Sequence, residues 1–151
     1  MIRNSAKAIL IRDSKILLIR NRSESDDWYT LPGGGQEKFE TLQAALKREC
    51  LEEAGLAVEV GELLFVREYI ARHHEFASKE PEVHQIEFHF RCNVDIKIPE
   101  VLPQIPDREQ IGIEWVDVKA LRNMAIYPKL LRQLPDHMAG QSFPVYLGDL
   151  N

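Results

Sequence analysis

Short runs of branched aliphatic residues alternate with charged residues along the N-terminal part of the chain. Two of these runs, residues 6–11 and 15–19, are separated by three polar positions, which is the pattern of two strands joined by a tight turn. A third short strand is expected at residues 28–31, before Pro32 and three consecutive glycines interrupt the pattern. The N-terminal region therefore predicts a β-hairpin, one more strand and a glycine-rich turn.

The pattern changes to that of a helix at residues 41–54. This segment is rich in Ala, Leu, Glu, Lys and Arg and contains neither Gly nor Pro, and Gly55 follows at the position of a C-terminal cap. The β-branched and aromatic residues at 56–69 and 83–94 then favour two strands. Because residues 71–82 are mostly polar, we expect a loop between these two strands.

The last part of the chain predicts one more strand and a helical end. Three prolines first mark a loop: Pro99, Pro103 and Pro106. Residues 111–118 have the pattern of a final strand, and one or two helices are expected at 118–124 and 129–138. Because strands and helices interleave without a repeat or a linker, the expected fold class is α/β (α+β), in a single domain of residues 1–151.

Composition and charge argue against several classes of function. The chain has 151 residues, 44% of them hydrophobic, and a net charge of −5, so no broad basic surface for a nucleic-acid polymer is expected. Charged residues interrupt the N-terminal segment every few positions, unlike a signal peptide or a membrane span. Cys50 and Cys92 lack metal-site spacing and are expected to be buried free thiols. We therefore expect a cytoplasmic protein that binds neither nucleic-acid polymers nor membranes.

Three glutamates, Glu49, Glu52 and Glu53, share one face of the predicted helix because they are spaced i, i+3 and i+4. Each pair of like charges at this spacing costs roughly 0.2–0.5 kcal/mol, and apolar residues on the same side turn the carboxylates toward the protein. Arg48 can neutralise only part of this charge. Oxygen ligation of Mg²⁺ or Mn²⁺ would compensate the rest. The alternative is a solvated acidic face on a structural or interaction protein.

The helix and the glycines before it form a longer pattern. With U for a bulky aliphatic residue, this pattern is G-x5-E-x7-R-E-U-x-E-E-x-G-U, and the region resembles the Nudix box. The matching residues are Gly34, Glu40, Arg48, Glu49, Glu52, Glu53, Gly55 and Leu56. Cys50 stands at the first aliphatic position, a departure that leaves every charged position intact. The sequences WYTLPGG before the box and EWV after it also resemble the family.

The resemblance to the Nudix family implies a fold, an activity and a metal site. The implied fold is a mixed β-sheet sandwiched between helices (α/β/α). The implied activity is hydrolysis of a nucleoside diphosphate linked to another moiety, with Mg²⁺ or Mn²⁺ as the cofactor. The metal ligands carried over from the family are Glu49, Glu52, Glu53 and the Gly33 carbonyl. Arg48 and Glu40 become an orienting pair, and Arg48 is also a catalytic candidate.

The general base of this reaction is left open between two places. Family members place it variously, so Glu52 or Glu53 from the box can take the proton from the attacking water. A loop carboxylate is the other possibility, and here Glu109 is the first candidate and Glu114 the second.

Substrate choice is expected to depend mainly on residues outside the box. The candidates for substrate binding are Trp28, Tyr29, Tyr69 and Gly34. The segments 65–76 and 99–110 are the other informative regions. The sequence leaves open ADP-ribose or another nucleotide sugar, a nucleoside triphosphate including oxidised ones, and a dinucleoside polyphosphate. A homodimer is compatible with the family, and the alternative function is a nucleotide-sensing or protein-binding module without turnover.

Four histidines lie close together in the sequence and raise a second metal hypothesis. They are His73, His74, His84 and His89. No Cys or third ligand stands at zinc spacing near them, so we interpret them as surface residues or as one substrate contact. The C-terminal segment, residues 135–151, shows no chemistry of its own.

Overall fold

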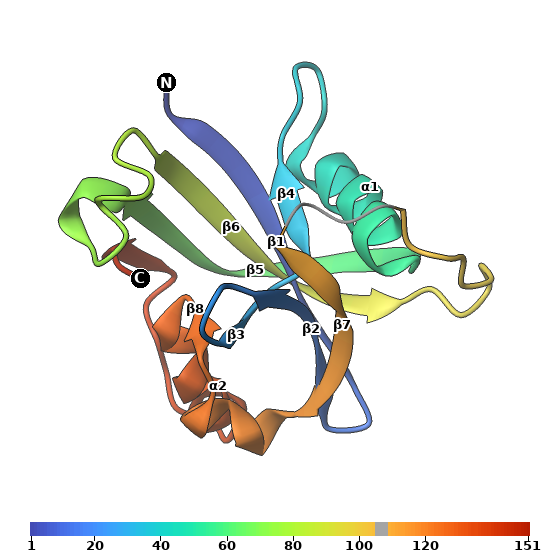
Figure 1. The fold of residues 1–151 in the computed structure, drawn as a ribbon. Coiled ribbons are helices and arrows are strands. Elements are labelled where there is room, and N and C mark those ends of the chain that lie inside the picture. The colour runs from blue at the N-terminus through green and yellow to red at the C-terminus, as the bar shows by residue number, and fades with distance from the viewer. Residues whose placement is uncertain (105–108) are drawn as a thin grey trace.

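The structure is a computed structural model that describes residues 1–104 and 109–151. Figure 1 shows a strongly curled sheet with helices on both sides. The described residues form nine strands: β1 (Arg3–Arg12), β2 (Lys15–Arg22), β3 (Asp27–Thr30), β4 (Gly33–Gly35), β5 (Val58–Ile70), β6 (His84–Val94), β7 (Gln110–Asp117), β8 (Ile126–Tyr127) and β9 (Tyr146–Asp149). They also form the α-helices α1 (Leu42–Ala54) and α2 (Leu134–Met138) and the 3₁₀ helices η1 (Ala71–His73), η2 (Val118–Asn123) and η3 (Lys129–Gln133). No helix in this part of the chain combines the length and the apolar character needed to cross a membrane.

The long strand β1 joins two halves of the sheet. It runs parallel to β6, from Arg3 opposite Gln85 to Leu10 opposite Cys92, and its end pairs with β2 across the hairpin. One half contains β4, β1, β6, β5 and β9, and the other contains β8, β3, β2 and β7. Since both halves start from β1, the sheet curls around this strand (Figure 1).

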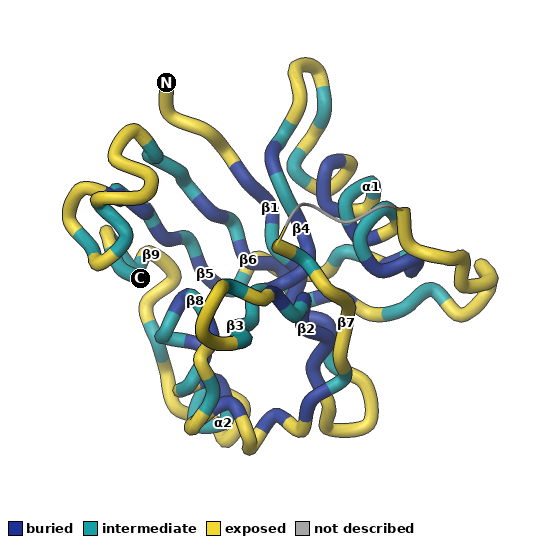
Figure 2. The backbone as a smooth tube through the Cα atoms, viewed as in Figure 1, coloured by how far each residue is buried: buried dark blue, intermediate teal, exposed yellow. Residues whose placement is uncertain are grey.

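Alternate residues of β1 face two separate cores. Ala6, Ala8 and Leu10 lie in one cluster with Leu46 of α1. Ile9 lies in the other cluster, with residues of β2, β7, η2, η3 and α2. Figure 2 shows the buried stretches of β1 and β2 between these two layers. Helices therefore cover both faces of the mixed sheet, which confirms the expected α+β sandwich.

Local backbone geometry confirms the predicted hairpin and helix. The turn Asp13-Ser14 has positive φ at both residues, as a two-residue type I′ turn requires. Helix α1 begins after Thr41, whose hydroxyl oxygen accepts a hydrogen bond from the Ala44 N–H at 3.0 Å. It ends at Gly55, where φ is 68° and an added Cβ would lie 1.8 Å from the Val101 carbonyl oxygen. Gly55 therefore caps the helix and also permits close packing of the loop that follows β6.

The structure corrects the sequence interpretation in three places. Gly33–Gly35, predicted as a turn, is strand β4 and pairs with β1. The short strands β8 and β9 were not predicted. The helical end is mostly 3₁₀, and only α2 is α-helical. Pro135 explains part of this difference, because it has no N–H with which to continue an α-helix from η3.

Candidate active site

The last two turns of α1 lie against strand β4. The Gly33 N–H donates a hydrogen bond to Glu53 Oε1 at 3.4 Å, and the Gly33 carbonyl accepts one from Lys7 Nζ at 3.2 Å. Gly34 lies directly beneath Glu49, because a Cβ atom there would be 2.5 Å from Glu49 Cδ. A glycine at position 34 is therefore what allows the Glu49 carboxylate to lie over the strand.

Arg48 connects the carboxylates of this region. Its guanidinium donates to Glu40 at 2.7 Å, to Glu49 at 2.8 Å and to Glu52 at 3.5 Å. It also donates to the Gly35 carbonyl at 3.0 Å, which ties α1 to the end of β4. The hydrogen bond from Arg48, followed by one from a loop N–H, lowers the pKa of Glu40 to about 2. The structure thus places the two members of the expected orienting pair in direct contact.

The carboxylates on α1 match a hard divalent cation in their chemistry. Glu49 and Glu52 offer carboxylate oxygens, the type of ligand that Mg²⁺ and Mn²⁺ prefer. Their side chains are 17% and 39% exposed, so both remain accessible to an ion. In residues 1–104 and 109–151, no three His, Cys, Asp or Glu side chains converge closely enough to hold a metal. Because one guanidinium contacts both Glu49 and Glu52, an incoming cation would compete with Arg48 for their oxygens.

A cavity of about 760 Å³ opens between the β5–β6 part of the sheet and the β3–β8 part. Its volume is in the range of small-molecule sites. Three aromatic residues contribute to one wall, and the Tyr127 ring meets Trp28 and Phe76 edge to face at centroid distances of 6.1 and 5.4 Å. These rings supply apolar surface on which a planar base can stack.

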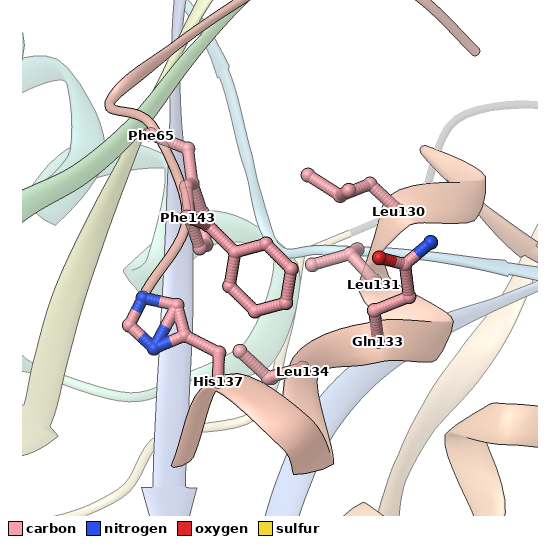
Figure 3. A pocket seen from close by; sticks show the side chains of 7 residues that line it. All are labelled: Phe65, Leu130, Leu131, Gln133, Leu134, His137 and Phe143. Carbon is pink, nitrogen blue, oxygen red and sulfur yellow. The ribbon is translucent and has the colours of Figure 1, made fainter. Parts of the chain in front are cut away.

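A second hollow lies under the C-terminal helices and is far smaller. Figure 3 shows its lining, in which the His137 ring lies near Phe143 and Phe65. Its volume is about 10 Å³, which is room for no more than about one water molecule. This hollow lies within the second core, which is the hydrophobic cluster that contains Ile9. It is too small for a nucleotide.

The cavity and the carboxylates of α1 are joined by two consecutive residues. Glu109 lines the cavity, and the next residue, Gln110, donates from Nε2 to Glu53 Oε2 at 3.3 Å. The backbone of Glu109 is fixed because the Arg22 N–H donates to its carbonyl at 2.9 Å. The backbone from Glu109 to Gln110 therefore connects the cavity to the metal-ligand candidates on α1.

The structure brings some of the sequence-predicted substrate residues to the cavity and not others. Trp28 and Tyr69 line it. Tyr29 does not, since its ring packs against the second core and its hydroxyl donates to Glu114 Oε2 at 3.2 Å. Glu114, the second candidate for the base, is therefore engaged outside the cavity. Part of the expected specificity segment 99–110, including Pro106, lies outside the described residues.

Several cavity residues were missed by sequence reasoning. Gln85 and Glu87 line the cavity, and so does Asn151, although the C-terminal segment showed no chemistry in the sequence. Arg67 also lines it and lies in the segment 65–76 that the sequence indicated, although it was not itself a candidate. The one available signal was the alternation in strand β6, where polar Gln85, Glu87 and His89 occupy every second position. A polar face on an otherwise apolar strand indicates either solvent or a site, and the sequence alone does not separate these.

The histidines lie near carboxylates. His73 Nδ1 and His74 Nε2 each lie 2.7 Å from one oxygen of Asp149. Burial raises the pKa of Asp149, but these two contacts outweigh it and lower the value to about 2. The pair therefore attaches η1 and the residue after it to β9.

Sequence comparison identifies relatives of the chain. A model of the NUDIX domain family matches residues 1–135. A Caenorhabditis elegans protein named "Putative nudix hydrolase 1" is 31% identical in an alignment 126 residues long, which covers 78% of this chain and 29% of that protein. The chain thus spans less than a third of the length of this curated relative.

Solved structures share the fold. A NUDIX hydrolase from Nitrosomonas europaea matches with a TM-score of 0.73 at 19% identity, over 96% of this chain and 94% of that one. An ADP-ribose pyrophosphatase from Streptococcus suis matches with a TM-score of 0.65 at 18% identity, over 97% and 98% of the two chains. At these identities the likeness concerns the fold.

Proposed function

The chain belongs to the NUDIX domain family, and we propose that it hydrolyses a diphosphate bond in a nucleoside diphosphate linked to another moiety, with Mg²⁺ or Mn²⁺ as the cofactor. The contact between Gln110 Nε2 and Glu53 Oε2, at 3.3 Å, supports this most directly. Because the neighbouring Glu109 lines the cavity, a nucleotide bound there extends its phosphates toward the carboxylates of α1.

The residues of α1 and β4 have distinct roles in this proposal. The cation ligands are Glu49, Glu52, Glu53 and the Gly33 carbonyl. When bound, the cation neutralises the diphosphate and lowers the pKa of a water molecule. Arg48 is a positioning residue, because its guanidinium contacts Glu49 and Glu52 while Glu40 holds it in place.

Glu109 is the general base in this proposal. Its side chain lines the cavity and its backbone is fixed by Arg22, so its carboxylate can take the proton from the attacking water. Glu80 lines the same cavity, and burial followed by the charge of Glu109 raises its pKa. Glu80 is therefore a competitor for this role, besides Glu52 and Glu53.

The substrate panel follows from the cavity and from the relatives. Trp28, Phe76 and Tyr127 offer aromatic faces to a base, which fits any nucleotide. One structural neighbour is named an ADP-ribose pyrophosphatase, so ADP-ribose belongs in the panel. Nucleotide sugars, nucleoside triphosphates, including oxidised ones, and dinucleoside polyphosphates complete it.

The test is phosphate release from this panel with Mg²⁺ or Mn²⁺ and a coupled phosphatase, comparing the wild type with Glu52→Gln. Glu52 is the most exposed of the three glutamates that Arg48 contacts, so the substitution should leave the fold intact. We expect turnover of at least one substrate and a loss of roughly 100-fold or more in the variant, the upper end of what support of a metal site contributes. Glu59→Gln, an exposed glutamate on β5, is the matched control and should retain full activity.

A second measurement separates the alternatives. Mg²⁺ or Mn²⁺ should raise the thermal unfolding temperature of the wild type and not that of Glu52→Gln, because a ligand that binds only the folded state stabilises it. A folded protein that turns over nothing but still binds nucleotides would be a sensing module on this scaffold. Absence of both metal stabilisation and nucleotide binding would support the acidic interaction protein.

A further inference from the structure

The floor of the cavity is a block of four side chains on one face of β5 and β6. Arg67 is opposite Glu87 in the register of these strands, and Tyr69 is opposite Gln85. The two pairs are two positions apart on each strand, so all four side chains point to the same side. All four line the cavity. The antiparallel ladder therefore builds a fixed polar floor beneath the aromatic wall.

The charged pair of this floor is buried and held in one geometry. Arg67 and Glu87 are 5% and 6% exposed, and Arg67 Nε donates to Glu87 Oε2 at 2.7 Å. Arg67 Nη1 donates to the Leu150 carbonyl at 2.7 Å, which fixes the guanidinium from the other side. Neither Glu87 Oε1 nor Arg67 Nη2 makes a hydrogen bond to the described residues, so each remains able to bind a ligand.

Glu87 is an acceptor and not a donor. Burial raises the pKa of this carboxyl, but the contact with His89 Nε2 at 3.5 Å and the charges of Arg67 and Lys7 outweigh burial and lower it. The carboxyl is therefore ionised near neutral pH and can only accept hydrogen bonds. A ligand that meets it must bring N–H or O–H groups.

Tyr69 adds a buried hydroxyl with no partner. Its side chain is 6% exposed, and its hydroxyl makes no hydrogen bond to the described residues. The ring is held by stacking on His74 at a centroid distance of 5.6 Å and by the Arg67 guanidinium at 5.2 Å. Asn151 Nδ2, on the same cavity wall, is also buried without a partner. Unpaired buried polar groups are unfavourable, so these donors are suited to a polar ligand edge.

We propose that this floor binds the hydrogen-bonding edge of guanine, with Glu87 accepting from N1–H and the 2-amino group, and with Tyr69, Arg67 or Asn151 donating to O6. Guanine presents two adjacent donors and one acceptor on this edge, which matches one carboxylate flanked by donors. The inference rests on the proposed nucleotide hydrolysis and adds the base that the substrate carries.

The same floor disfavours other bases. Adenine and cytosine each turn a ring nitrogen lone pair toward the position of the carboxylate, which repels it. Uracil has one donor between two acceptors, and hypoxanthine keeps O6 and N1–H but lacks the 2-amino group. A site that is built to pair with a group rejects the analogue that lacks the group, because the site's own polar atoms are then left unpaired. The expected order of affinity is guanine, hypoxanthine and then adenine.

The first experiment is calorimetric binding of mononucleotides without divalent metal. GMP, IMP and AMP carry the same ribose phosphate, and ribose 5-phosphate is the probe without a base. GMP should bind roughly 10-fold tighter than IMP and roughly 100-fold tighter than AMP, since one hydrogen bond to a charged group changes affinity by about one order of magnitude. Equal affinities, tighter binding of AMP, or no binding of GMP to the folded protein would overturn the proposal. Ribose 5-phosphate binding as tightly as GMP would assign the floor to the sugar instead.

Two variants localise the effect. Glu87→Gln should remove the preference for GMP over IMP, because the amide replaces one of the two acceptor oxygens by an NH₂ donor, which opposes the donors of guanine. Tyr69→Phe removes only an unpaired hydroxyl, so it should fold normally and still weaken GMP binding several-fold. Tyr146→Phe is the matched control, since its hydroxyl donates to Glu68 outside the cavity, and it should bind GMP like the wild type. Unchanged GMP binding in a folded Tyr69→Phe protein, or a retained preference in Glu87→Gln, would contradict the assignment.

These measurements test the guanine site separately from the proposed function. Mononucleotide binding needs neither metal nor hydrolysis, so a guanine preference without turnover would uphold the floor and reject the enzyme. Turnover of the substrate panel without a base preference would do the opposite.

Discussion

Two charged clusters in this protein contain the same residue types and differ in how they are built. Around Arg48, three carboxylates from the sequence segment 40–52 share one guanidinium, and the Arg48 side chain is 27% exposed. In the cavity floor, Arg67 pairs with Glu87 across two strands, and the side chains are 6% and 8% exposed. The residues of the first cluster are close together in the sequence and partly exposed to solvent, whereas the two residues of the second are far apart in the sequence and buried.

This difference separates a site that exchanges partners from one that holds a fixed geometry. In contact with water, Arg48 can release a carboxylate at little cost, because exposed ion pairs contribute little to stability. Arg67 and Glu87 have lost their hydration, and each compensates the charge of the other. Removing either one therefore leaves a buried charge without a partner. The Arg48 cluster is therefore suited to binding and releasing a cation, and the Arg67 cluster to recognition by shape and hydrogen bonds.

The largest expected effect comes from breaking the dry pair. Arg67→Met should lower the free energy of unfolding by about 3–5 kcal/mol, because it leaves Glu87 buried and ionised without its partner. Arg122→Met, which breaks the exposed pair with Asp136, should cost at most about 1 kcal/mol. Urea unfolding of both variants measures the contrast. Similar losses in the two variants would show that the buried pair has no special role.

The next effect compares two adjacent glycines of β4. Gly33 has a φ of 131°, and an added Cβ would lie 2.0 Å from the Ala6 carbonyl oxygen, so Gly33→Ala should cost about 2–3 kcal/mol through backbone strain. At Gly34 the atoms nearest to the Cβ belong to the end of the Glu49 side chain and not to the backbone. Gly34→Ala should therefore change stability by less than about 1 kcal/mol.

Gly34→Ala should have a large effect on activity although its effect on stability is small. Displacing the Glu49 carboxylate should lower kcat/KM more than roughly 10-fold, as loss of metal-site support does. Urea unfolding and a coupled phosphate assay on each variant check both statements. A Gly34→Ala enzyme with wild-type kcat/KM would mean that Glu49 need not lie over β4.

The same contrast explains how much of the fold was predictable. The hairpin and α1 follow from spacing and caps within a few residues, and both were predicted. Strand β4 was taken for a turn because glycine has no side chain to indicate a strand, and its pairing with β1 is a tertiary contact. The strands β8 and β9 are short, and they depend on partners about 80–100 residues away in the sequence, β3 and β5.

The residues of the candidate site also differ in whether the sequence could predict them. The carboxylates of α1 were singled out from their i, i+3 and i+4 spacing, which helix α1 contains, and their role as metal ligands stays a prediction. Arg67 and Glu87 are twenty residues apart, and their meeting depends on the register of β5 with β6, which includes irregularities between Val60 and Phe65. A shift of one residue would turn Glu87 to the opposite face, so the sequence pattern alone did not reveal the floor.

A smaller effect is expected when the guanidinium of residue 48 is replaced by the ammonium group of a lysine. Arg48 contacts Glu40, Glu49 and the Gly35 carbonyl with different nitrogens, and the single ammonium of a lysine cannot reach all three. Arg48→Lys should cost about 1 kcal/mol in stability, typical of partly exposed hydrogen bonds, and lower kcat/KM by about 10–100-fold. Lys47→Arg, at an exposed position of the same helix, is the control. Full activity in Arg48→Lys would show that charge alone suffices.

The smallest effect is the part of the pH dependence of stability that comes from Glu40 in the solvated cluster. Glu40 has a pKa of about 2 in the folded protein against an ordinary value of 4.5, so its contact with Arg48 stabilises the fold fully above about pH 4.5 and loses this contribution as the pH falls toward about 2. The stability difference between the wild type and Glu40→Gln should therefore be constant from about pH 7 to 5 and shrink below about pH 4. Urea unfolding across this range measures the difference. Glu62→Gln, an exposed glutamate on β5, should show no such change. A difference for Glu40→Gln that stays constant down to about pH 2.5 would mean that the ionised form is not what Arg48 holds.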